Sequence, residues 1–147
     1  MRGDRPLNIS RGIIAVALLT TLAACNSSTA LDFTALTGVW IADAIVYTDN
    51  ANPGTTVDVL VRDGASWQMS IQNNGGTAVT FDDGLGNARS FGGRFLADEG
   101  VVILDDEEYI VVRVSNRMTF TNANQMFQFD PSAGPVSVTI RVEVGRL

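Results

Sequence analysis

Short stretches of alternating apolar and polar residues, separated by turn-forming residues, are the feature that most constrains the fold of this chain. The alternation is clearest in 65–72 and 136–146, where apolar side chains occupy every second position. A period of two places one face of a strand in a core and the other in water. The pattern predicts ten strands, of which short neighbours could merge: 38–48, 56–62, 65–72, 77–81, 88–96, 101–104, 109–115, 118–121, 125–130 and 136–146.

Tight turns are predicted between most of these strands. Asp, Asn, Ser and Gly residues, which tolerate the backbone angles of hairpins, fill the connections at 63–64, 73–76, 98–100, 115–117 and 122–124. Short connections make sequential strands neighbours, and closing such a meander into a barrel removes its exposed edges. We therefore predict an all-β, up-and-down antiparallel barrel of about eight to ten strands. A two-sheet sandwich is the alternative, although its crossing connections usually need longer loops.

A different pattern precedes the strands. Residues 1–11 carry three arginines and one acid, and 12–24 carry no charge. A basic stretch followed by an apolar one is typical of a secretory signal peptide. The apolar run is shorter than the roughly 20 residues that a membrane-spanning helix needs, so cleavage is the better interpretation.

The residues that close this segment, Leu22-Ala23-Ala24-Cys25, resemble the lipobox of bacterial lipoproteins. The resemblance implies that 1–24 are removed, that Cys25 is lipidated, and that the protein is held in the cell envelope by this anchor. Several acyl chains attach a protein firmly, because each buried CH₂ contributes about 0.8 kcal/mol. In enteric bacteria an Asp after the cysteine favours the inner membrane. Asn26 stands here, so the outer membrane, facing the periplasm, is expected. An ordinary signal peptide is the alternative.

The composition of residues 25–147 excludes several classes of function. After residue 24 the chain holds 15 acidic residues and 7 arginines, for a net charge of −8, with no lysine or histidine. This charge argues against binding of nucleic acid. Without histidine, and with one cysteine that lipid would occupy, the usual triads and zinc sites are excluded, and we predict no enzyme, no metal and no cofactor. The acidic stretches 82–87 and 105–108 are interpreted as solvated turns rather than calcium or glycosidase sites.

The start of the predicted barrel adds a second resemblance. Gly38-Val39-Trp40 is similar to the Gly-x-Trp that opens the first strand of lipocalins, after a short helical turn. The resemblance implies that Trp40 plugs the closed end and that an arginine near the end of the last strand stacks on it. In an up-and-down meander with an even number of strands, that strand ends where the first begins. Arg146 is on its inward face and is the candidate partner. The resemblance divides the chain into 1–24, a tether and helical turn at 25–36, and a lipocalin-like barrel at 37–147.

The sequence is compatible with two functions. In the first, a small apolar ligand such as a fatty acid or isoprenoid binds at the mouth, which the strand count places at 49–55, 73–76, 97–100, 115–117 and 130–135. Alternation puts Ala42 and Ala44 on the inward face shared with Trp40. It nominates six ligand-lining side chains: Trp67, Met69, Met118, Phe120, Phe127 and Phe129. In the second, the same side chains form a filled core and the loops contact an envelope protein, as an assembly partner or inhibitor would.

Overall fold

The computed structural model describes residues 32–96 and 98–147. The predicted signal peptide, the lipobox and Cys25 lie outside the described residues. The elements follow in the order α1 (Phe33–Leu36), β1 (Gly38–Asp49), β2 (Thr56–Asp58), α2 (Val59–Arg62), β3 (Ser66–Ile71), β4 (Gly76–Asp82), β5 (Ala88–Leu96), β6 (Val101–Leu104), β7 (Glu107–Val114), β8 (Arg117–Phe127) and β9 (Val136–Arg146).

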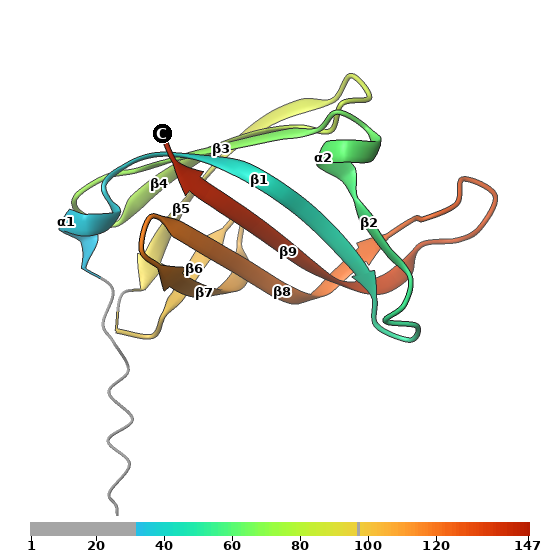
Figure 1. The fold of residues 1–147 in the computed structure, drawn as a ribbon. Helices are drawn as coiled ribbons and strands as arrows, with labels where there is room; N and C mark the ends of the chain where they lie inside the picture. Colours follow the sequence, from blue (N-terminus) through green and yellow to red (C-terminus); the bar gives the residue numbers. More distant parts are fainter. Residues whose placement is uncertain (1–31, 97) are drawn as a thin grey trace, which may run out of the picture.

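The strands form one closed antiparallel barrel. β1, β3, β4, β5, β6, β7, β8 and β9 are hydrogen-bonded in sequence order, and β9 pairs back with β1 (Figure 1). β2 is an additional strand that pairs only with the C-terminal part of β1, at 46–48. The predicted all-β barrel is confirmed, and closure removes the sandwich alternative.

Period-two alternation explains why these segments are strands. In β9 the inward residues Val138, Ile140, Val142 and Val144 are buried, while Arg141 between them is exposed. Each such residue buried against the opposite wall contributes roughly 1.5 to 3 kcal/mol relative to leaving it in water. A shift of one residue would turn the whole row outward, which fixes the register of the strand.

The segment 56–62, predicted as a strand, does not cross the barrel. It forms the short β2 and then the helical turn α2, which begins where the Asp58 carboxylate accepts hydrogen bonds from the backbone N–H groups of Leu60 and Ile45. A side-chain oxygen that satisfies the free N–H groups of a helix start stabilises the turn. The chain therefore stays near the end of the barrel that β1 reaches. The predicted strand is confirmed at 56–58 and is wrong at 59–62.

The two neighbouring segments 118–121 and 125–130 merge, as short predicted strands could. The structure has one long strand, β8, interrupted by a bulge between Asn122 and Gln125, where the Asn124 N–H donates to the Asn122 side chain. A bulge adds a residue to one strand without ending it. Another bulge at Asp43 in β1 turns Ile45 rather than Ala44 inward, so the predicted inward position of Ala44 is also wrong.

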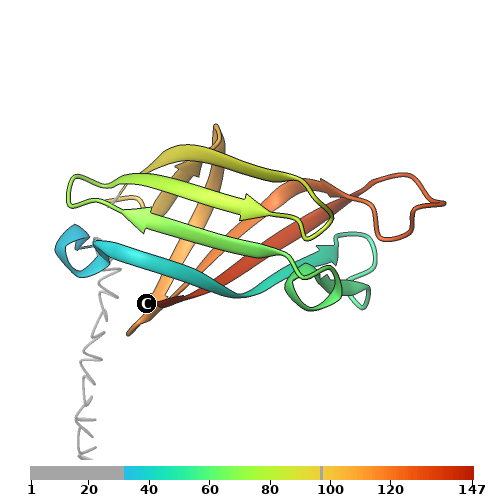
Figure 2. The ribbon, with the colours of Figure 1, turned by 90° about the horizontal axis from the view of Figure 1, so that it is seen from above.

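These corrections change which loops lie at which end. Because 56–62 does not cross, β3 runs back toward the end where β1 starts, and the turns at 72–75, 98–100 and 115–116 lie at that closed end. The opposite, open end carries 50–55 with β2 and α2, and the connections 83–87, 105–106 and 128–135. Of the five predicted mouth loops, only the first and last belong to the open end (Figure 2).

The closed end is built around Trp40, which has no exposed surface. Its indole Nε1–H donates to the carbonyl oxygen of Leu36 at 2.8 Å, which fixes α1 across the end of the barrel. Arg146 pairs with Trp40 across β1 and β9, and its guanidinium carbon lies 5.9 Å from the indole ring centroid. The guanidinium also donates to the carbonyl oxygens of Ala35 and Thr37. A Cβ at Gly38 would lie 3.4 Å from this guanidinium.

Candidate functional site at the open end

The barrel interior contains a small cavity toward its open end. Its volume is about 60 Å³, well below the several hundred Å³ of typical ligand pockets. Aliphatic residues such as Ile45 and Val142 line its deeper part together with Trp67 and Phe120. Its outer part is lined by larger aromatic and polar side chains: Tyr47, Phe81, Arg89, Phe91, Tyr109 and Gln125. The interior therefore has room for a few water-sized groups but not for a large molecule.

A second and larger hollow lies outside this cavity, at the mouth. This mouth cleft has a volume of about 430 Å³, within the range of small-molecule pockets. It lies between α2, the β4–β5 loop and the start of the β8–β9 loop, and it shares Tyr47 and Phe81 with the inner cavity. Leu85 and Met126 line it with 72% and 61% of their surfaces exposed. Exposed apolar side chains gathered around a concave surface are typical of a binding site.

The structure divides the six predicted ligand-lining residues among different places. Trp67 and Phe120 line the inner cavity, and Phe127 lines the mouth cleft. Phe129 packs edge-on against Phe127, with ring centroids 5.1 Å apart. Met69 and Met118 line neither hollow, because they are fully buried in the closed half, where Met69 pairs with Trp40.

Sequence reasoning missed the most prominent aromatic pair of the site. Tyr47 stacks on Phe127 with centroids 4.1 Å apart and ring planes 12° apart. Tyr47 points inward only because the bulge at Asp43 changes the alternation of β1. In the sequence, the apolar positions change from even numbers, Trp40 and Ala42, to odd numbers, Ile45 and Tyr47. This change could have indicated the bulge.

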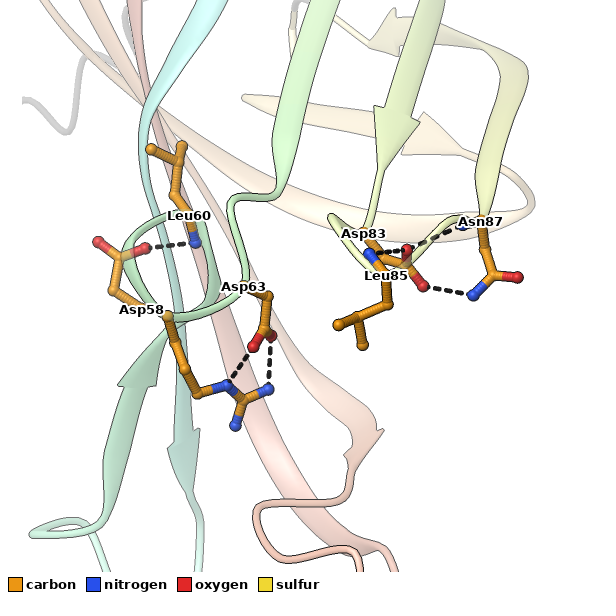
Figure 3. A network of polar contacts seen from close by, with 7 residues as sticks. Asp58, Leu60, Asp63, Asp83, Leu85 and Asn87 are labelled. Atoms are coloured by element: carbon orange, nitrogen blue, oxygen red, sulfur yellow. Dashed lines mark hydrogen bonds and ion pairs between the residues drawn. The ribbon is translucent and has the colours of Figure 1, made fainter.

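The rim of the mouth cleft is fixed by a close backbone contact between α2 and the β4–β5 loop (Figure 3). Gly84 has a φ of +74°, and a Cβ there would overlap the carbonyl oxygen of Asp63. A residue without a side chain is required for this approach. Two Asp side chains thus come to line the same cleft: Asp63, which ends α2, and Asp83, which begins the loop.

The two rim carboxylates are held in different ways. Asp63 forms a bidentate ion pair with Arg62, at 2.6 and 2.7 Å, and this hydrogen bonding lowers the pKa of Asp63. Asp83 accepts hydrogen bonds from the side chain and backbone N–H of Asn87 and from the Leu85 N–H, which lower its pKa (Figure 3). Both carboxylates are therefore charged at neutral pH, and only that of Asp63 is matched by an arginine lining the cleft.

Guanidinium groups already lie over the aromatic rings of the open end. Arg62 is 5.3 Å from the centroid of Phe127, and Arg89 is 5.1 Å from Phe91 and 5.8 Å from Phe81. Such contacts are favourable because the ring face is the negative part of its quadrupole. The aromatic lining is thus suited to positive charge.

Burial raises the pKa of both tyrosines, and these two are the only tyrosines of the chain. For Tyr109 the pKa rises to about 12, chiefly because loss of water disfavours the phenolate. Nearby negative charge from Tyr47 and Glu107 adds to this effect. The hydroxyl groups that face the cavity are therefore neutral at any ordinary pH.

Charge is distributed unequally between the two ends of the described chain. The closed end has four acids, Asp32, Asp43, Asp98 and Glu99, and four arginines, Arg94, Arg113, Arg117 and Arg146. Arg141 and Glu143 form an ion pair on the wall between the ends. The open end has two arginines, 62 and 89, and ten acids: Asp49, Asp58, Asp63, Asp82, Asp83, Asp105, Asp106, Glu107, Glu108 and Asp130. The net charge of −8 therefore belongs to the open end.

Within residues 32–96 and 98–147, no three acidic, Cys or His side chains are grouped so that they could hold a metal ion. In the part of the chain that the structure describes, no helix is both long and apolar enough to span a membrane. Comparisons with protein-family profiles, with curated proteins and with solved structures find no match.

Proposed function

We propose that this protein is a lipid-anchored lipoprotein of the bacterial cell envelope, with a lipocalin-like barrel that binds a small apolar molecule in the mouth cleft and catalyses no reaction. The observation that carries the binding proposal is the 430 Å³ cleft lined by exposed apolar side chains. The inner cavity of about 60 Å³ is too small for a fatty acid or isoprenoid. The ligand is therefore bound at the mouth, with at most one small group reaching inward.

The proposed anchor gives the barrel an orientation. The described chain begins at Asp32, next to α1 and the closed end. A chain from Cys25 to Asp32 spans at most about 25 Å when extended. Lipid on Cys25 would thus keep the closed end toward the membrane and leave the mouth facing solvent. Asn26 after the cysteine supports the outer membrane, on its periplasmic side.

The anchor is tested by metabolic labelling with a palmitate analogue. The natural chain is expected to take up label and to fractionate with membranes. Replacement of Cys25 by Ala should abolish both. Label on the Cys25→Ala variant would contradict the lipoprotein proposal.

Ligand binding is tested by extracting the purified full-length protein with organic solvent and analysing the extract by mass spectrometry. A stoichiometric apolar molecule is expected, in addition to lipid carried by the anchor. The matched control is Met126→Asp, because this side chain is 61% exposed and lines the cleft, so the change places a charge in the site without opening the core. An extract identical for both proteins would contradict ligand binding at the cleft.

A second candidate function, contact with an envelope protein, is favoured by the outer face of β7. Ile110, Val112 and Val114 point outward with 59%, 57% and 70% of their surfaces exposed. Three consecutive outward apolar residues resemble the centre of a protein interface. A photo-crosslinking residue at Val112 is expected to capture one partner in the envelope, and the same residue at outward-facing Gln68 none. Equal capture from both positions would contradict this function.

A further inference from the structure

We propose that the molecule bound in the mouth cleft is an amphipathic organic cation, an apolar body that carries an amine or quaternary ammonium group. The inference rests on the proposed ligand-binding function and adds the sign of the ligand's charge. Three independent features of the described residues carry it: the lining of the cleft, the charges that face it, and the field of the open end.

The lining accounts for both parts of such a ligand. The rings of Tyr47, Phe81 and Phe127 form the aromatic part of the cleft, and Leu85 and Met126 form its exposed aliphatic part. An aromatic ring attracts a cation lying over its face while also packing against apolar groups. The chain's own arginines lie over Phe81 and Phe127.

The charges facing the cleft leave one carboxylate without a matching cation. Arg62, Asp63 and Asp83 line it, and Arg62 is held by Asp63 through two hydrogen bonds. Asp83 accepts hydrogen bonds only from neutral donors, at Leu85 and Asn87. An ammonium group near Asp83 and Phe81 would therefore complete the charge balance, with its apolar body extending over Leu85 and Met126.

The electrostatic field of the whole open end also favours a cationic ligand. Both arginines of the open end are paired with carboxylates, Arg62 with Asp63 and Arg89 with Asp105, and this end as a whole carries the net charge of −8 of residues 25–147. A field of one sign concentrated around a cleft attracts ligands of the opposite sign and repels those of the same sign. This distribution of charge disfavours the binding of fatty acids and other apolar molecules that carry a carboxylate.

The test uses three probes with one body: 4-phenylbutylammonium, 4-phenylbutan-1-ol and 4-phenylbutanoate. Binding to the full-length protein is measured by calorimetry at low and at moderate salt. We expect the ammonium to bind at least tenfold more tightly than the alcohol and the carboxylate most weakly. The advantage of the ammonium should shrink as salt is added, because exposed charges are screened.

Two variants with the same change in charge locate the effect. Asp83→Asn keeps an oxygen that accepts the Leu85 and Asn87 N–H groups but removes the charge, and it should weaken the ammonium severalfold without changing the alcohol. Glu99→Gln removes one charge at the closed end and should change neither. Leu85→Ala, at an exposed position, should weaken all three probes alike.

The outcomes separate this inference from the function on which it rests. Equal affinity of the three probes, or tightest binding of the carboxylate, would overturn the cationic ligand and leave apolar binding at the cleft in place. An equal effect of Asp83→Asn and Glu99→Gln would also overturn it. Absence of binding by all three probes would overturn both the inference and the proposed binding function.

Discussion

The two halves of this barrel are built from the same strands and differ in almost every other respect. The closed half is apolar, fully packed and electrically balanced, with Trp40, Leu36, Met69 and Met118 without appreciable exposure. The open half holds the inner cavity, the mouth cleft and all of the net negative charge. The packed core and the larger hollow therefore lie at different ends of one structure, so that each can be perturbed separately.

The largest expected difference comes from removing one aromatic side chain from each half. Trp40→Ala should lower the free energy of unfolding by about 3 to 5 kcal/mol, because it leaves a cavity in the packed end and removes the hydrogen bond to Leu36. Phe127→Ala, at a half-buried position of the cleft, should cost clearly less. Urea denaturation measures both. Similar losses would show that the mouth is as essential to folding as the plug.

The next effect is expected on the alkaline side, where the two tyrosines of the open half titrate. Because both tyrosines lie in the cavity and burial raises their pKa values, that of Tyr109 to about 12, the folded protein resists ionisation above pH 10. The unfolded chain ionises near 10. The stabilisation is therefore complete below pH 10 and is lost as pH rises through about 12.

Absorbance of tyrosinate measures this effect directly. The native protein should ionise later than its denatured form, and Tyr109→Phe should remove the latest step. If both tyrosines ionised at the same pH as in the denatured chain, the open half would be more accessible to water than the structure indicates.

A smaller change tests the outer support of the closed end. Arg146→Ala should lower the free energy of unfolding by about 1 kcal/mol, because it removes the contact over Trp40 and the hydrogen bonds to Ala35 and Thr37. Arg113→Ala, the removal of another arginine from the same end, is the control for charge alone. Equal stability of Arg146→Ala and the natural chain would remove the best support for the lipocalin resemblance.

The smallest expected effect is on the acid side of the open half. Hydrogen bonding lowers the pKa of Asp83, so its contribution to stability is present above its ordinary pKa near 4 and is lost as pH falls through the folded value. Asp83→Asn should therefore be slightly less dependent on pH below 4 than the natural chain. Thermal unfolding between pH 2 and 6 measures the difference, and parallel curves would contradict it.

Much of the architecture could be predicted from local patterns. Alternation and turn residues indicated a closed antiparallel barrel, and the inward face of β9 was assigned correctly because it depends on neighbouring residues alone. Two of the ten expected crossings are absent: 56–62 does not cross the barrel, and 118–130 crosses once rather than twice. The even number of crossings therefore survived, and the last strand still ends beside the first, where Arg146 pairs with Trp40.

The candidate site was predicted less well, because the end at which each loop lies depends on how many strands before it cross the barrel. Three of the five expected mouth loops lie at the closed end, and the acidic stretches 82–87 and 105–108, interpreted as solvated turns and not assigned to the mouth, lie at the open end. Tyr47 was missed because a bulge reverses the face of β1 at Asp43. Bulges and the direction of each strand depend on long-range pairing, which a local pattern does not contain.

The sequence by itself determined the fold class, the identity of most inward residues and the excess of acidic residues, since these depend on composition and on spacing along the chain. Only the tertiary structure decided that the acids gather at one end, that the interior is nearly filled and that the larger hollow lies outside it. These properties arise from residues distant in sequence: α2 meets the β4–β5 loop through Gly84 and Asp63, and Tyr47 meets Phe127 across the mouth. The hydrogen bonds to Asp58 begin α2, and the bulge at Asp43 turns Tyr47 inward.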